Sequence, residues 1–246
     1  MRVEPIDLRP FREGDDSDRQ RVAEQFDHAA RTSGFLSVGG HGVDPGLTTR
    51  MPDVTAAFFD LDPHEKMAYF AEDRSANRGY APEGSEALAY SLGEQVLPTD
   101  LFEAFDAGLE LTAADLADPQ PNQMRMGAHT DNGSITVLLA DPVPGLQICD
   151  GEGRWHDVVP SPGSFVVNVG DLLAEWSNDR WWSTLHRREQ GRIVVPSPGT
   201  TDGPVRRRSV AWFQQPNWDA VIECLPTCAD ESNPPRYAPV TSGDFR

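Results

Sequence analysis

The chain has 246 residues, of which 38% are hydrophobic and 24% charged, and this composition predicts one compact domain with its own core. Its 39 acidic residues outnumber its 21 basic ones, and the formal net charge of −18 would repel phosphate backbones and anionic lipid. The composition therefore disfavours nucleic-acid and membrane partners. It favours a small-molecule ligand. We expect a monomer or weak homo-oligomer.

The sequence also indicates a compartment. It contains neither a run of about 18 apolar residues nor, after Met1, the apolar stretch of a secretory signal. The cysteines Cys149, Cys224 and Cys228 are odd in number and scattered, which argues against a disulfide framework. Cys224 and Cys228 could join a metal site, but no second pair of cysteines completes one. We therefore expect a cytoplasmic protein.

The first predicted element is an amphipathic helix at residues 17–33. Ser17 and Gln20 form a capping-box pattern, apolar residues recur at helical spacing after them, and Gly34 supplies a stop. Residues 35–38 then predict a short strand, because they are apolar and are followed by a glycine-rich turn.

Two further helices are predicted from aspartate–proline pairs. Asp44-Pro45 is typical of a helix N-terminus and predicts helical structure that reaches Phe59, with a break at Pro52. Asp62-Pro63 predicts a second, shorter helix. We therefore expect the first third of the chain to be mainly helical.

The pattern changes from Leu101 onward, where short apolar runs are separated by clusters of Pro, Gly, Asp and Asn. Such spacing predicts an antiparallel barrel or jelly roll. The fold class is thus mainly β with flanking N-terminal helices. The predicted strands are residues 134–140, 145–149, 164–169 and 207–214.

A candidate metal site begins with His129-Thr130-Asp131, in which an imidazole and a carboxylate stand two residues apart. In a strand such residues point to the same face, so both can bind one ion. His186 lies in a short segment that can supply a third ligand from a neighbouring strand. Two histidines and one carboxylate are the ligands of non-haem iron(II) oxygenases. The triplet alone is a weak motif, and the alternatives are a turn histidine at the surface for His129 and a core histidine for His186.

The surroundings of these residues contain several separate motifs in one order. The motifs are Met126–Leu139, Pro144–Ile148, Asn168–Leu173, Trp176–Arg180 and Ser183–Arg187, preceded in the first third by Gly34–Val38, His41–Val43 and Arg78–Tyr80. Through them nearly the whole chain resembles the isopenicillin N synthase-like family of iron(II)/2-oxoglutarate-dependent dioxygenases.

This resemblance implies a fold, a division of the chain and an activity. The fold is a double-stranded β-helix, a cupin-like jelly-roll barrel, with an N-terminal helical region at residues 1–106 and the barrel at residues 107–246 in one compact unit. His129, Asp131 and His186 are implied to bind Fe(II) and to form the catalytic centre. The implied enzyme consumes 2-oxoglutarate and O2, releases succinate and CO2, and hydroxylates, desaturates or cyclises a small molecule.

A candidate 2-oxoglutarate site lies in Arg206-Arg207-Arg208-Ser209, at the start of a strand-like run. Alternation places Arg207 and Ser209 on one face and Arg208 on the other. The planar guanidinium of arginine can bind a carboxylate through two parallel hydrogen bonds, although three arginines can also form a solvated strand start. In the family an Arg-x-Ser pair at this position holds the distal carboxylate of 2-oxoglutarate. The resemblance therefore implies Arg207 and Ser209, with Arg206 and Arg208 facing solvent.

The chain departs from the family between Asp106 and Met124. There the relatives have a long helical stretch, followed by a strand with a tyrosine or asparagine that assists 2-oxoglutarate binding. The corresponding residue stays unassigned here. Either the helical stretch is absent from this protein, or the printed sequence omits it. Two alternative functions follow, an iron oxidase of the same family that uses no 2-oxoglutarate and a catalytically silent cupin-like binding protein. Succinate formation and dependence on iron distinguish them from the dioxygenase.

Overall fold

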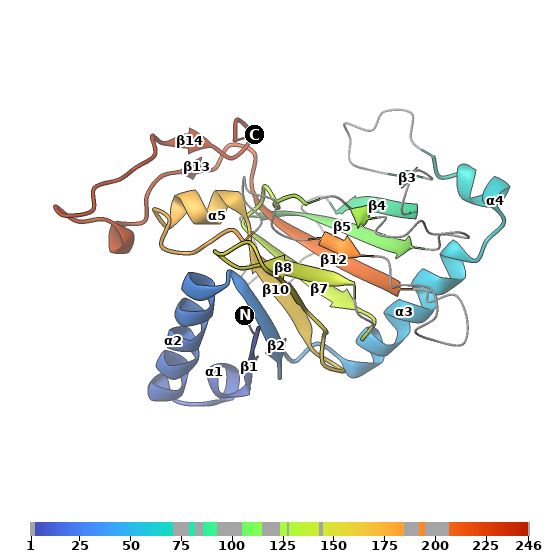
Figure 1. Ribbon diagram of the computed structural model, residues 1–246, viewed down its shortest axis with the longest axis horizontal. Coiled ribbons are helices and arrows are strands. Elements are labelled where there is room, and N and C mark those ends of the chain that lie inside the picture. The colour runs from blue at the N-terminus through green and yellow to red at the C-terminus, as the bar shows by residue number, and fades with distance from the viewer. Residues whose placement is uncertain are drawn as a thin grey trace.

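An eight-stranded and a four-stranded sheet dominate the structure, with helices mainly from the N-terminal part (Figure 1). This computed structural model describes residues 3–70, 79–81, 86–92, 105–114, 124–126, 128–142, 145–184, 192–194 and 207–245. The helices are α1 (Arg9–Glu13), α2 (Asp16–Thr32), α3 (Pro45–Phe59), α4 (Pro63–Met67) and α5 (Asp171–Trp176), with a 3₁₀ turn at Pro226–Cys228. The strands are β1 (Glu4–Asp7), β2 (Phe35–Gly39), β3 (Gly79–Ala81), β4 (Glu86–Leu92), β5 (Phe105–Ala114), β6 (Met124–Met126), β7 (Ile135–Ala140), β8 (Leu146–Cys149), β9 (Trp155–Asp157), β10 (Phe165–Val169), β11 (Arg192–Val194), β12 (Arg207–Pro216), β13 (Val221–Ile222) and β14 (Val240–Thr241).

The strand order of the large sheet is β1-β2-β10-β7-β12-β5-β4-β3, and that of the small sheet is β6-β11-β8-β9. β1 pairs with β2 in parallel, whereas the other neighbouring strands of both sheets are antiparallel. β13 and β14 form a separate ribbon near the C-terminus (Figure 1). No helix among the described residues is long and apolar enough to cross a membrane.

The two sheets pack against each other through apolar side chains. Phe35, Leu138 and Val166 of the large sheet lie in one cluster with Leu146 and Ile148 of β8. Ile148 is completely buried. We call the side of the large sheet that faces β8 its inner face, because alternation along each strand then assigns every second residue to it.

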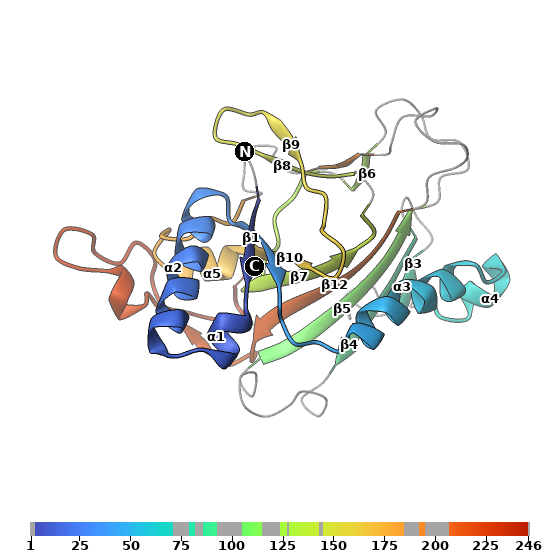
Figure 2. The same ribbon diagram turned by 90° about the horizontal axis from the view of Figure 1, so that it is seen from below.

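Helices cover the opposite, outer face of the large sheet (Figure 2). One cluster joins Val22 and Ala29 of α2 to Leu36 and Val38 of β2. A second joins Phe59 of α3 to Val210 of β12, together with Tyr80. The apolar stripes of α2 and α3 are thus buried on the sheet, which explains why these amphipathic segments are helical here.

The predicted first helix is confirmed, but its cap differs. The side chain of Asp15 accepts a hydrogen bond from Asp18 N at 3.0 Å, and the Asp18 carboxylate accepts one from Asp15 N at 3.2 Å. The capping box is therefore Asp15 with Asp18, and not Ser17 with Gln20. Both pairs have the required spacing of three residues, and the earlier one begins the helix.

The helices predicted from the aspartate–proline pairs are confirmed as α3 and α4, and the Asp44 and Asp62 side chains cap them. The predicted break at Pro52 is wrong, because α3 continues through this residue. Proline removes one backbone donor from a helix. Phe59 and its neighbours pack against β12 beyond this point, and their burial keeps the helix continuous.

The four strands predicted after Leu101 are confirmed as β7, β8, β10 and β12. β4 and β5 are not predicted, although β5 pairs with β12 on one side and β4 on the other. Gly108 and two acidic residues weaken the local strand pattern of β5. The strand forms because β4 and β12 pair with its backbone on both sides. The division at residues 106 and 107 stays a prediction, and β5 spans it.

A glycine fixes how closely the start of β2 approaches residues 182–184. Gly34 has φ +63°, and a Cβ there would overlap Trp182 O and Thr184 Oγ1. Trp182 N donates to Ala30 O at 2.9 Å, and Thr184 Oγ1 donates to Ser33 O. Only a residue without a side chain permits this contact.

We therefore expect Gly34→Ala to destabilise the fold. Gly163→Ala is the matched control, since Gly163 has φ +71° with no atom within 4 Å of its virtual Cβ. The control should lower the free energy of unfolding by about 1–2 kcal/mol through backbone strain alone. Gly34→Ala should lower it by a further ~1–3 kcal/mol because of overpacking. Equal losses in urea denaturation would show that the contact at Trp182 is unimportant.

Candidate metal centre

His129 and Asp131 lie close together in the loop before β7. His129 Nε2 and Asp131 Oδ1 are 3.7 Å apart, with side chains 43% and 13% exposed. Since nitrogen and carboxylate ligands lie about 2.0–2.2 Å from a divalent metal, one ion can contact both atoms. The described residues contain no group of three or more His, Cys, Asp or Glu that could hold an ion. His186 lies outside them, so its role as third ligand stays a prediction.

The second oxygen of Asp131 is held by two uncharged donors. Thr136 Oγ1 donates to Asp131 Oδ2 at 2.5 Å, and Asn168 Nδ2 donates to the same atom at 2.7 Å. Thr136 and Asn168 are 5% and 7% exposed. Both bonds fix the carboxylate without a positive charge beside Oδ2, so Oδ1 keeps its orientation beside His129. This arrangement fits a carboxylate that binds a metal through one oxygen.

Sequence reasoning missed Thr136 and Asn168 as members of the site. They are direct partners across β7 and β10, on the inner face of the large sheet. A signal was present, because each is the single polar residue inside an otherwise apolar strand. A buried polar group is costly unless it has a hydrogen-bond partner, so such a residue indicates a partner nearby.

The loop that carries Asp131 packs closely on the loop before α5. Asp171 N donates to Asp131 O at 2.8 Å, and Gly170 N donates to Ser134 O at 2.9 Å. A Cβ at Gly170 would overlap Gly133 O. The two backbones therefore meet where neither side chain nor water intervenes.

Asp171 is a second carboxylate beside this loop, and sequence reasoning missed its contacts too. Thr130 Oγ1 donates to its Oδ2 at 3.0 Å, and Ser183 Oγ donates to its Oδ1 at 2.8 Å. No short-range pattern shows these bonds, since their partners are 41 and 12 residues away along the chain.

The predicted alternation along β12 agrees with the burial of Ser209 and Val210. Ser209 is 5% exposed and lies opposite Ala140 of β7, on the inner face that carries Thr136. Val210 packs with α3 on the outer face. The Arg207 backbone pairs with Ala114 at the start of the strand, while its side chain lies outside the described part.

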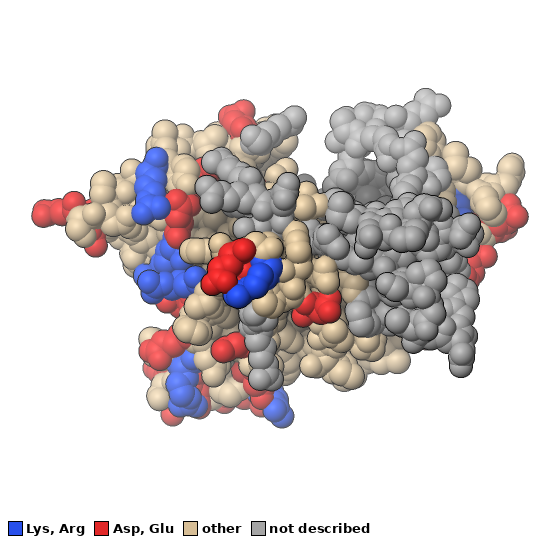
Figure 3. Space-filling model, viewed as in Figure 1, with Lys and Arg blue, Asp and Glu red and all other residues tan. Residues whose placement is uncertain are grey.

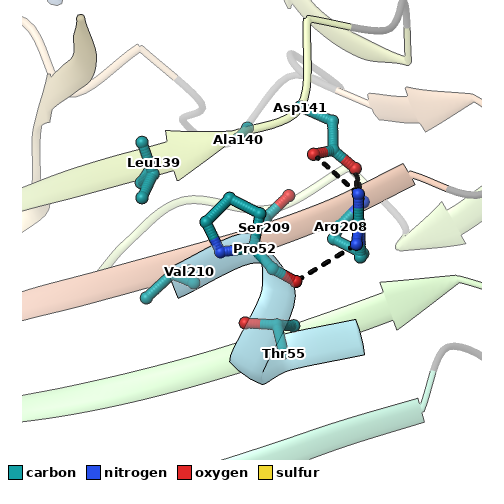
Figure 4. A pocket seen from close by; sticks show the side chains of 8 residues that line it. All are labelled: Pro52, Thr55, Leu139, Ala140, Asp141, Arg208, Ser209 and Val210. Atoms are coloured by element: carbon teal, nitrogen blue, oxygen red, sulfur yellow. Dashed lines mark hydrogen bonds and ion pairs between the residues drawn. The ribbon is translucent and has the colours of Figure 1, made fainter. Parts of the chain in front are cut away.

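The prediction that Arg208 faces solvent is wrong. Its side chain is 27% exposed and lies between β7, β12 and α3 (Figure 4). Arg208 Nε donates to Asp141 Oδ2 at 3.0 Å, and Nη1 donates to Pro52 O at 3.1 Å. An ion pair with Asp141 thus occupies the Arg208 guanidinium.

A hollow of about 310 Å³ borders the loops of the two carboxylates. Its lining includes Asn132 and Leu172, which directly follow Asp131 and Asp171 along the chain. The other lining residues belong to the end of β12 and the C-terminal segment and are Gln215, Pro216, Trp218, Ser242, Gly243 and Phe245.

Two family models match the chain. Residues 3–126 match the model described as non-haem dioxygenase in morphine synthesis N-terminal. Residues 114–215 match that of the 2OG-Fe(II) oxygenase superfamily.

Individual proteins are similar over most of the chain. A 2-oxoglutarate-Fe(II) type oxidoreductase of Emericella nidulans is 29% identical over 314 aligned positions, covering 98% of this chain and 87% of that protein. Because the aligned positions outnumber the 246 residues of this chain, the relative contains segments that this chain lacks. A homoarginine-6-hydroxylase of Oryza sativa subsp. japonica is 27% identical and covers 88% of this chain and 84% of its own.

A solved structure shows the same fold. A full-length protein of Neurospora crassa, solved in complex with alpha-KG and thymine, superposes with a TM-score of 0.85 and 26% identity. The match covers 99% of this chain and 94% of that one.

We expect Asn168→Ala to weaken binding of a divalent metal about tenfold, because Asp131 Oδ2 loses one of its two donors. Isothermal titration calorimetry without oxygen measures this affinity. Gln147→Ala is the control, since it removes an amide donor to the Asp157 carboxylate at 2.8 Å on β8 and β9. Equal metal affinity in both variants would contradict the role of Asn168.

Proposed function

Because the chain belongs to the iron(II)- and 2-oxoglutarate-dependent oxygenases, we propose that His129, Asp131 and His186 bind its iron. The protein is an oxidoreductase that depends on iron(II) and 2-oxoglutarate, with O2 as co-substrate. The observation that carries the residue assignment is the Asp131 carboxylate, with Oδ2 fixed by two neutral donors and Oδ1 3.7 Å from His129 Nε2.

The proposed architecture around this site is a jelly-roll barrel, the double-stranded β-helix. Its support is the packing of the large sheet on β8 and the outer position of α2 and α3. The inner face then forms the lining of the barrel, and the loop of His129 and Asp131 lies at one end of it.

The bound iron supplies the chemistry that converts 2-oxoglutarate and O2 to succinate and CO2 while a substrate is hydroxylated, desaturated or cyclised. The contribution of the chain is to fix ligands and to exclude water. Asn168 and Thr136 hold Asp131 in one orientation, and their burial keeps water from competing for Oδ2.

The proposed 2-oxoglutarate contacts are Arg207 and Ser209. Ser209 lies opposite Ala140, which is four residues from Thr136 along β7, so the two ends of the site are about 13 Å apart on one face. Arg207 shares the parity of Ser209 in β12, and this supports its side chain as the partner of the distal carboxylate. The Ser209 hydroxyl can donate to the same carboxylate.

The experiment that tests this function is an anaerobic titration of the iron(II)-loaded protein with 2-oxoglutarate, followed by the visible metal-to-ligand charge-transfer band. Arg207→Ala should require about 10- to 100-fold more 2-oxoglutarate, because two charge-assisted hydrogen bonds are lost. Arg208→Ala should keep the affinity within about twofold and lower only the melting temperature, since that guanidinium is bound by Asp141.

The opposite result, with 2-oxoglutarate affinity lost in Arg208→Ala and kept in Arg207→Ala, would exchange the two roles. His186→Ala should show no band at the iron concentration that saturates the parent. Iron binding by the parent without a band or succinate would favour the oxidase instead.

A small molecule is the proposed substrate. Relatives are named as homoarginine-6-hydroxylases, and the Neurospora crassa protein has been solved with thymine. Figure 3 shows acidic side chains beside basic ones over the described part of one face. The net charge of −18 disfavours a polyanionic substrate. The cytoplasmic location and the monomeric or weakly oligomeric state stay predictions.

We place this substrate in the hollow between Asn132, Leu172 and Trp218, whose volume of about 310 Å³ suits a small ligand. Compounds that accelerate succinate formation should shift the indole N–H resonance of Trp218 in NMR spectra. The indole of Trp182, 54% exposed beside α2, is the control and should not move. Stimulating compounds that leave Trp218 unchanged would place the substrate elsewhere.

A further inference from the structure

Asp171 joins two segments that the proposed metal site must bring together. Its Oδ2 accepts from Thr130, the residue between His129 and Asp131, at 3.0 Å. Its Oδ1 accepts from Ser183, three residues before His186 along the chain, at 2.8 Å. One carboxylate therefore contacts both ligand-bearing segments.

The backbone of Asp171 adds a third bond, since its N–H donates to Asp131 O at 2.8 Å. Asp171 opens α5 directly after Gly170, whose lack of a side chain permits the close approach to Gly133. The carboxylate is thus held on a rigid element against the loop of His129 and Asp131.

The segment up to Thr184 is fixed from its other side by α2. Arg180 Nε donates to Asp27 Oδ1 at 2.8 Å, and Trp181 Nε1 donates to the same oxygen at 2.9 Å. The hydrogen bond from Arg180 lowers the pKa of Asp27, so this anchor stays charged at neutral pH. On this side, α2 holds the segment against the outer part of the fold. On the other side, the bonds from Ser183 and Thr130 to the Asp171 carboxylate link the segment to the loop of His129 and Asp131.

We propose that Asp171 is a positioning residue that sets the distance between the His129–Asp131 pair and the segment leading to His186, so that three ligands converge on one ion. This inference rests on the proposed function. Asp171 acts through Thr130 and Ser183 and is itself no ligand. Loss of its carboxylate leaves two hydroxyls without an acceptor and lets the segments separate.

The test is binding of cobalt(II) alone to the full chain, followed by its visible d–d absorption, which reports both affinity and coordination geometry. Asp171→Ala should weaken cobalt(II) binding about 10- to 100-fold and change the band shape. Asp171→Asn keeps one acceptor oxygen, and hydroxyls can accept from its amide, so it should stay within about threefold of the parent.

Asp150→Ala is the matched control. Asp150 accepts hydrogen bonds from Arg154 and His156 in the turn before β9, so its loss should lower the melting temperature and leave cobalt(II) affinity unchanged. Ser183→Ala removes a single hydroxyl and replaces Asp171→Ala as the test variant if Asp171→Ala does not fold. It should weaken binding about 3- to 10-fold, and Thr130→Val should show non-additive coupling with it.

Two outcomes would overturn the inference in distinguishable ways. If the parent and His186→Ala bind cobalt(II) alike, the proposed three-ligand site fails, and the role of Asp171 fails with it. If His186→Ala loses binding while Asp171→Ala or Ser183→Ala stays within twofold of the parent, the ligand assignment stands and Asp171 has no positioning role.

Discussion

The close approach of two loops, one before β7 and one before α5, is the constraint on which the site depends. Gly170 allows the backbone of the loop before α5 to approach Gly133 O, and bonds from Asp171 N to Asp131 O and from Gly170 N to Ser134 O hold the contact. Each loop follows or precedes a strand of the large sheet, so the sheet register fixes their relative position. The loops that carry Asp131 and Asp171 are thereby brought together from distant parts of the sequence.

The carboxylates of Asp131 and Asp171 are both held by uncharged donors. Here hydroxyls and an amide donate to their oxygens, through Thr136 and Asn168 on Asp131 and through Thr130 and Ser183 on Asp171. Such donors orient the two groups without placing a positive charge beside them. The Asp131 carboxylate is thus presented in one orientation to the proposed divalent cation.

Periodicity and caps in the sequence predicted α2, α3, α4 and the four main strands, because these features are local. The continuation of α3 through Pro52 and the strand β5 were missed, since burial on β12 and pairing with two neighbours determine them. In the site, the spacing of His129 and Asp131 and the family resemblance predicted the pair, and the structure has their side chains 3.7 Å apart. Their supporting residues were not predicted, because Asn168 lies 37 residues from Asp131 along the chain.

The register between β7 and β12 relates the two ends of the proposed site. Ser209 pairs with Ala140 and Phe213 with Thr136, so the metal end and the carboxylate end share the inner face. A slip of β12 by one residue would turn Arg208 and Val210 inward and Arg207 and Ser209 outward. The burial of Val210 under α3 and the backbone pairing of β12 with both β5 and β7 oppose that slip. Contacts on the outer face therefore stabilise the register on which co-substrate binding depends.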